Sequence, residues 1–158
     1  MNSSGSFLSS KVKSRDLLLL HVLSSPSPQR LRAKVERVYS TRKGVDQKCL
    51  GKEIEFVRSP GNWGDVALVV GERALVFISS ISNTFYEDAW HGHLIVEEGE
   101  RGLFAVFPQK ELWLCEDVPE IIRACSSQDV KRSYATAIQF EILEKYLIAL
   151  IEETDRGN

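Results

Sequence analysis

The sequence has 158 residues, of which 43% are hydrophobic and 27% are charged, with 10 Gly and 5 Pro. This composition excludes a disordered or fibrous protein, and no apolar run reaches the roughly 18 residues that cross a bilayer, which excludes an integral membrane protein. The formal net charge of -2 conceals an asymmetry, because residues 1–48 hold ten Lys and Arg against three Asp and Glu, and the remainder is acidic.

Residues 1–15 are expected to form a flexible N-terminal tail, because the first ten are rich in Ser and Gly and show no periodic pattern. The basic run Lys11–Arg15 and the apolar run Leu17–Leu23 loosely resemble a secretory signal peptide, but Asp16 and His21 interrupt that pattern. We therefore expect a cytoplasmic protein rather than a secreted one.

The cysteines favour the same compartment. The chain has three cysteines at spacings that match no zinc or redox motif, whereas a secreted domain with disulfides typically has an even number. Reduced thiols are therefore the expected state of Cys49, Cys115 and Cys125.

Short strands are predicted from residue 16 onward. The apolar run Leu17–Leu23 is typical of a strand buried on both faces. Apolar and charged residues alternate over residues 30–36, which predicts a half-exposed strand with a basic outer row. The basic row consists of Arg30, Arg32 and Lys34. Residues 53–56 alternate in the same way, and their outer residues Glu53 and Glu55 are expected to pair with the basic row.

Apolar runs predict the later strands, at Ala67–Val70, Arg73–Ile78, Trp90–Val96, Leu103–Phe107 and Glu111–Leu114. Arg73–Ile78 holds the most apolar stretch in the middle of the chain and is expected to be a central strand. Asn83–Asp88 is predicted to be a loop, and Glu97–Gly102 is predicted to be a hairpin turn.

Helical patterns begin near residue 117. Asp117, followed by Pro119 and Glu120, has the capping pattern of a short helix that extends to about residue 125. A long helix is predicted from about Gln128 to Glu153, with apolar side chains over about half of its circumference. We expect this helix to pack on the preceding strands, and the alternative is that part of its apolar stripe forms a homo-oligomer contact.

The order of these elements predicts a mainly β chain with C-terminal α structure (α+β). Five or six short antiparallel strands followed by helix favour a small β-barrel that the long C-terminal helix closes. The expected parts are a flexible tail at 1–15, a barrel at 16–115 and a helical segment packed on the barrel at 116–158.

Three segments resemble the strand series of netrin-type modules, the group that includes the tissue inhibitors of metalloproteinases. They are Val35–Tyr39, Gly51–Phe56 and Val70–Ile78, and the resemblance covers residues 31–78. It implies an OB-like barrel that binds proteins through its loops. The paired cysteines of that family and its metal-clasping N-terminal cysteine are missing, so the inhibitory mechanism is not carried over.

His91 and His93 are the candidate metal ligands, since positions i and i+2 of a strand share a face. Oxygen donors close in sequence are Glu87, Asp88 and Glu97. A structural zinc needs four protein ligands and a catalytic zinc usually three, whereas only two histidines occur here. We therefore expect two surface histidines beside a glycine bend, with no cofactor.

Three aromatic residues are the candidate partner-binding residues, because Trp63, Tyr86 and Trp90 lie in predicted loops or at strand ends. Exposed aromatic residues form the centres of protein interfaces, although they also plug the mouths of small barrels. The sequence contains no phosphate-binding glycine loop and no nucleophile elbow. We therefore expect a non-enzymatic protein-binding module, in its narrower form an inhibitor or immunity protein that neutralises a toxin or enzyme.

Two alternatives remain from other functional classes. An oligonucleotide-binding barrel would use the basic row, but the neighbouring glutamates oppose a polyanion. A metal-dependent enzyme would use His91 and His93.

Overall fold

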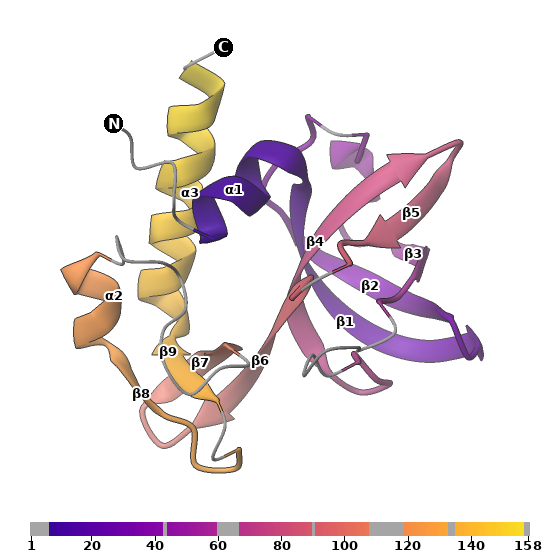
Figure 1. The fold of residues 1–158 in the computed structure, drawn as a ribbon. Helices are drawn as coiled ribbons and strands as arrows, with labels where there is room; N and C mark the ends of the chain where they lie inside the picture. The colour runs from indigo at the N-terminus through magenta and orange to yellow at the C-terminus, as the bar shows by residue number, and fades with distance from the viewer. Residues whose placement is uncertain are drawn as a thin grey trace. The chain divides into compact units, whose positions relative to one another are not determined.

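The computed structural model describes residues 7–42, 44–59, 67–89, 91–107, 119–132 and 135–156. Its elements are α1 (Phe7–Ser14), β1 (Asp16–Ser27), β2 (Arg30–Val38), the 3-10 turn η1 (Gln47–Cys49), β3 (Glu53–Val57), β4 (Arg73–Ile81), β5 (Thr84–Glu87), β6 (His93–Gly99), β7 (Gly102–Phe107), α2 (Glu120–Ala124), β8 (Ser126–Gln128), β9 (Thr136–Gln139) and α3 (Phe140–Arg156) (Figure 1). They form two compact units, one from Arg15 to Ile95 and the other from α1 together with the chain after Ile95.

The first unit, which we call the barrel unit, is a closed five-stranded barrel. Its strands follow the order β1-β2-β3-β5-β4, and β4 pairs back with β1 (Figure 1). The pairings are antiparallel except for the parallel pair β3–β5. A five-stranded barrel of this kind is OB-like, which confirms the predicted fold class.

Burial within the barrel follows the predicted patterns. β1 pairs with both β2 and β4, and its residues Leu17–Leu20 are buried, as expected of a strand covered on both faces. β2 alternates between buried and outward residues, with Leu31, Ala33 and Val35 at 0% exposure. Register shifts at three places in the pairing of β1 with β2 mark bulges or irregularities, and bulges increase strand twist and help a sheet curl closed.

The second unit, which we call the helical unit, combines a small sheet with the three helices. β6 starts beside β4 in the barrel unit and ends in this unit, where the strand order continues with β7, β9 and β8. α3 packs against α1, β7, β9 and α2. Its buried residues are Phe140, Leu143, Leu147 and Ile151. Ile148 of α3 is 39% exposed. The homo-oligomer contact of this helix stays a prediction.

Part of the predicted long helix is a strand. β9 occupies Thr136–Gln139, and α3 begins only at Phe140. The register of β9 against β7 extends from Gln139 opposite Phe104 to Thr136 opposite Phe107. This pairing joins segments about thirty residues apart, and such tertiary contacts override local helix propensity.

Three further expectations differ from the structure. Residues 7–14 form α1 instead of a flexible tail, because Leu8 and Val12 lie one helical turn apart and are both buried. Ala67–Val70 forms no strand, and the Leu68 carbonyl instead accepts a hydrogen bond from Arg58 Nη1 at 2.8 Å. The compact units divide the chain after Ile95 rather than at residue 115. The predicted strand at 111–114 and the Asp117 cap lie outside the described residues.

Candidate functional site

The β4–β5 hairpin presents apolar side chains on the outside of the barrel. Its turn residues, Ser82–Asn83, both have positive φ, 51° and 65°, which is the geometry of a tight two-residue hairpin turn. Ile78 pairs with Glu87 across the hairpin, and both side chains are buried. Because alternate residues of a strand point to opposite faces, Ile81 and Tyr86 lie on the outer face.

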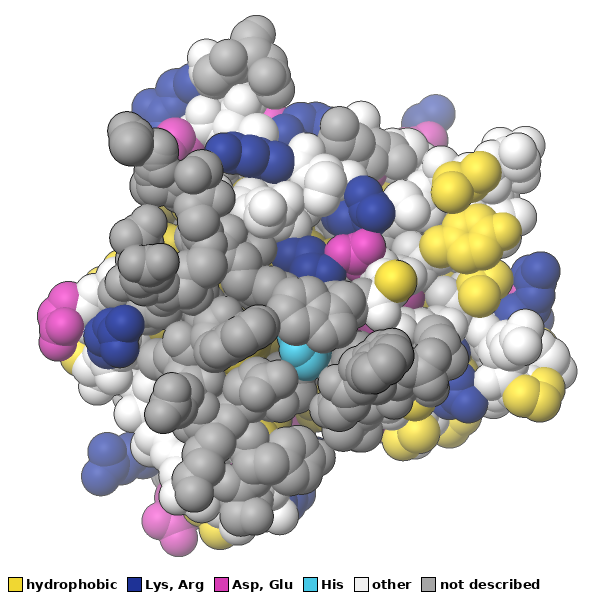
Figure 2. All heavy atoms as spheres, viewed as in Figure 1, with side chains coloured by type: hydrophobic (Ala, Val, Ile, Leu, Met, Phe, Trp, Pro, Cys, Tyr) yellow, Lys and Arg dark blue, Asp and Glu magenta, His cyan; other side chains and the backbone are white. Residues whose placement is uncertain are grey.

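Val57 extends this outer surface onto the neighbouring strand, because β3 pairs in parallel with β5 and Val57 lies opposite Tyr86. Ile81 is 60% exposed, Tyr86 is 37% exposed and Val57 is half-buried. We call these three residues the apolar patch. Figure 2 shows hydrophobic side chains gathered at this end of the barrel, over β5 and its hairpin with β4. Exposed apolar side chains that include a tyrosine are typical of the centre of a protein interface.

Among the predicted partner-binding residues, the structure describes Tyr86. It lies on β5 rather than in the predicted loop and is partly exposed, and its part in partner binding stays a prediction. Trp63 and Trp90 lie outside the described residues, so their part in the site stays a prediction. Sequence reasoning missed Val57 and Ile81. The available signal for Ile81 was the Ser-Asn pair that follows it, which favours a hairpin turn.

Glu87, on the inner face of β5, forms a buried pair with His93 of β6. His93 Nδ1 is 2.6 Å from Glu87 Oε2, and the two side chains are 4% and 0% exposed. Glu87 Oε1 accepts a hydrogen bond from the backbone N–H of Ser59 at 2.9 Å. The carboxylate of Glu87 therefore joins β5 to the start of β6 and to the segment that follows β3.

The prediction of two surface histidines is wrong, since His91 and His93 are 1% and 5% exposed. His91 lies in a turn with φ of 47°, and only His93 belongs to β6, so they are not an i and i+2 pair on one strand. The Gly92 carbonyl accepts a hydrogen bond from the Phe77 N–H, which holds this turn against β4. Gly92 has no room for a side chain, because a Cβ there would meet the Asp88 carbonyl oxygen.

His93 Nδ1 is engaged with Glu87, so a metal ion could bind this ring only through Nε2. Among the residues that the structure describes, no group of three or more His, Cys, Asp and Glu side chains could hold a metal ion. The metal-dependent enzyme that would use His91 and His93 stays an alternative hypothesis.

The basic row pairs with β3 as predicted. Arg32 lies opposite Glu55 and Lys34 lies opposite Glu53 in the register. Glu55 accepts hydrogen bonds from Arg30 at 3.2 Å and from Arg32 at 3.4 Å. Exposed ion pairs of this type add little stability, typically about 0–1 kcal/mol. They also oppose nucleic-acid binding, because a nucleic-acid backbone would have to compete with the Glu55 carboxylate for both arginines.

Cys49 and Cys125 are free thiols in the structure, and Cys115 lies outside the described residues. Burial raises the pKa of the Cys49 thiol. Only the thiolate reacts with alkylating agents, so we expect Cys49 of the folded protein to react more slowly with iodoacetamide than Cys49 of the unfolded protein, at about pH 8.

Mass spectrometry of each cysteine peptide after timed alkylation measures this difference. In denaturant, all three cysteines of protein from its native source should titrate as free thiols. A disulfide between Cys115 and Cys125 would contradict the reduced state.

Comparisons with known proteins found no relative: no protein-family model matches the chain, and neither a curated protein nor a solved structure matches it. The function is therefore inferred from the chemistry of the surfaces described above. Within the described residues, no helix has the length and apolar character needed to cross a membrane.

Proposed function

We propose that this chain is a non-enzymatic binding protein whose barrel unit docks on another protein through the apolar patch. The exposure of Ile81 and Tyr86 on one face of the β4–β5 hairpin is the observation that carries the proposal. Burying such side chains against a partner removes apolar surface from water, which is the main favourable term in protein association. Tyrosine is also among the residues that most often dominate interface energetics.

Two further features support docking on a protein over docking on a nucleic acid. Glu55 neutralises two residues of the basic row through its contacts with Arg30 and Arg32. The resemblance of residues 31–78 to netrin-type modules implies binding of proteins through loops. An OB-like barrel alone would not discriminate, because one fold serves many functions.

In its narrower form, the proposed protein is an inhibitor or immunity protein of a reducing compartment such as the cytoplasm. The free state of Cys49 and Cys125 supports the compartment. The partner is then a toxin or an enzyme with an apolar surface of matching shape.

Substitution of the apolar patch is expected to weaken partner binding. Tyr86→Ala should reduce affinity by at least about 2 kcal/mol, the scale of an interface hot spot, because truncation removes the largest side chain of the patch. Ile81→Ser should act in the same direction, and Trp63→Ala and Trp90→Ala are predicted to match Tyr86→Ala. The partner is isolated on the immobilised wild-type chain and identified by mass, and its affinity for each variant is then measured by calorimetry.

The matched control is Leu23→Ala, which truncates a side chain that is 40% exposed on β1, a strand that pairs with β2 and β4. It should leave affinity unchanged, as should Arg32→Glu. The proposal would be overturned if Arg32→Glu lowers the affinity for the partner while Tyr86→Ala leaves that affinity unchanged. Binding of labelled single-stranded DNA that weakens steeply with salt would then identify the basic row as the site.

A further inference from the structure

α3 exposes one side of its surface along the length of the helix. Its buried residues repeat every three or four positions and face the rest of the helical unit. On the side away from them lies a set of exposed residues that we call the outer face of α3. Its members are Glu141, Lys145, Ile148, Ala149, Glu152 and Arg156. They follow the spacing of three and four positions that brings residues to one side of a helix.

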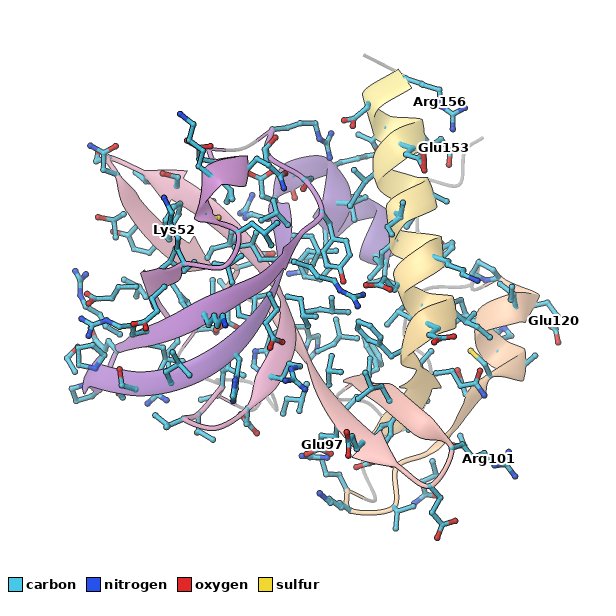
Figure 3. The ribbon with its side chains drawn as sticks, turned by 180° about the vertical axis from the view of Figure 1, so that it is seen from behind. Lys52, Glu97, Arg101, Glu120, Glu153 and Arg156 are labelled. Carbon is cyan, nitrogen blue, oxygen red and sulfur yellow. The ribbon has the colours of Figure 1, made fainter. Side chains whose placement is uncertain are left out.

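The charged side chains of the outer face are available to a partner. Glu141, Lys145 and Glu152 form no side-chain hydrogen bond or ion pair within the described residues. Arg156 donates from Nε to the backbone carbonyl of Glu152 at 3.4 Å, and its terminal nitrogens form no hydrogen bond to the described part of the chain. Figure 3 shows Arg156 near the C-terminal end of α3, together with Glu153.

The order of charges on the outer face is complementary to itself when the helix is reversed. From the N-terminal end the order is acidic, basic, apolar, acidic and basic, and the apolar centre is Ile148–Ala149. Lys145 lies three positions before this centre and Glu152 lies three positions after it. Glu141 lies seven positions before it and Arg156 lies seven positions after it. A second α3 that runs in the opposite direction, centred on the same two residues, therefore places a glutamate opposite each lysine or arginine.

A parallel pairing of two α3 helices lacks this match. In register it would place Glu141 opposite Glu141 and Lys145 opposite Lys145 of the other copy. Like charges that face each other across an interface are costly, so the pattern disfavours this arrangement. Antiparallel helices also bring the positive end of one dipole beside the negative end of the other. The outer face therefore selects the antiparallel orientation, which a two-fold axis between two copies generates.

Ile148 provides the apolar contact at the centre of such a pairing. Its side chain is 39% exposed, although the residues around it on the outer face are mostly charged. A two-fold axis at Ile148–Ala149 places Ile148 beside its own counterpart, which removes apolar surface from water. The small side chain of Ala149 allows the two helix axes to approach closely.

We propose that α3 binds α3 of a second copy of this chain, antiparallel, with Ile148 and Ala149 at the two-fold axis. Lys145 of each copy then pairs with Glu152 of the other, and Glu141 of each pairs with Arg156 of the other. Because one helix from each copy makes a small interface held partly by exposed charges, the dimer is weak and sensitive to salt. All of these residues lie in the helical unit, so the proposal is independent of the apolar patch.

Sedimentation equilibrium of the full-length chain, with its thiols kept reduced, tests the proposal. At low salt the mean mass should rise towards that of a dimer as the protein approaches about 1 mM, and about 1 M NaCl should weaken the association. Lys145→Glu and Glu152→Lys should each weaken dimerisation at least about tenfold, because each places like charges opposite one another. The combined variant restores both pairs with reversed polarity, and its dimerisation should return to within about threefold of the wild type.

The matched control is Glu153→Lys, which makes the same change of charge about 100° around the helix from Glu152 (Figure 3). It should leave dimerisation unchanged. Ile148→Glu should weaken dimerisation at least about tenfold, because it places two carboxylates at the axis. All of the substituted residues are exposed, so each variant should keep its fold, which circular dichroism checks.

A chain that stays monomeric up to about 1 mM would overturn the proposal. A combined variant that dimerises no better than Lys145→Glu or Glu152→Lys alone would overturn it too, as would equal losses from Glu152→Lys and Glu153→Lys. Self-association that Tyr86→Ala abolishes and Glu152→Lys leaves unchanged would assign the contact to the apolar patch and would likewise overturn the proposal.

Discussion

Phe77→Ala is expected to lower the free energy of unfolding by about 3–5 kcal/mol, the range for truncating a fully buried aromatic side chain. Phe77 is 0% exposed and lies on β4, where its backbone carbonyl accepts from the Asp88 N–H while Leu17 of β1 lies opposite it. The substitution therefore leaves a cavity at the strand that closes the barrel. Urea denaturation followed by circular dichroism measures the change.

The control for this prediction is Ile81→Ala, four residues further along the same strand, where the side chain is 60% exposed. It should cost less than about 1 kcal/mol, because little apolar area is lost from the core. Similar denaturation midpoints for Phe77→Ala and the wild type would contradict the central position of β4.

His93→Ala is the second substitution with a large expected effect, also about 3–5 kcal/mol of unfolding free energy. The variant leaves the fully buried Glu87 carboxylate without the imidazole that lies 2.6 Å away, and the carboxylate keeps the hydrogen bond from the Ser59 N–H at 2.9 Å. Removing one member of a buried pair is costly because the other stays in a low-dielectric environment without compensation. Thermal and urea unfolding of the purified variant measure the loss.

A double-mutant cycle separates this pair from simple loss of packing. Replacing both Glu87 and His93 with Leu should cost less than His93→Ala alone, because no uncompensated carboxylate then remains buried, while the Ser59 N–H loses its partner. The exposed control is Arg30→Ala, whose partner Glu55 stays in contact with water, and it should cost less than about 1 kcal/mol. A negligible effect of His93→Ala would restore the prediction of surface histidines.

Local patterns in the sequence were sufficient for several strands and for the main surface charges. The alternation at residues 30–36 predicted which side chains of β2 are buried and which face outward, and the structure agrees at each buried position. The cross-strand pairing of Arg32 with Glu55 followed from two such patterns in neighbouring strands. These predictions succeed because a strand repeats every two residues, so its buried face is encoded within a short segment.

The boundary between β9 and α3 shows where local patterns are insufficient. Thr136–Gln139 continues into a helical apolar stripe without a break, and only its pairing with β7 makes it a strand. α1 is a similar case, because the burial of Leu8 and Val12 depends on contact with α3, at the other end of the sequence. Secondary structure in such segments is decided by the packing partner rather than by propensity.

The candidate sites divide in the same way. Sequence by itself determined that Tyr86 is a candidate interface residue and that the basic row has glutamates to neutralise it. Only the tertiary structure decided that Tyr86 has Ile81 and Val57 beside it, that His93 meets Glu87 in the core, and that Ile148 lies exposed on the outer face of α3. The physical reason is that burial and hydrogen-bond partners depend on which distant strands become neighbours when the barrel closes and the small sheet forms, and this information is spread over the whole chain.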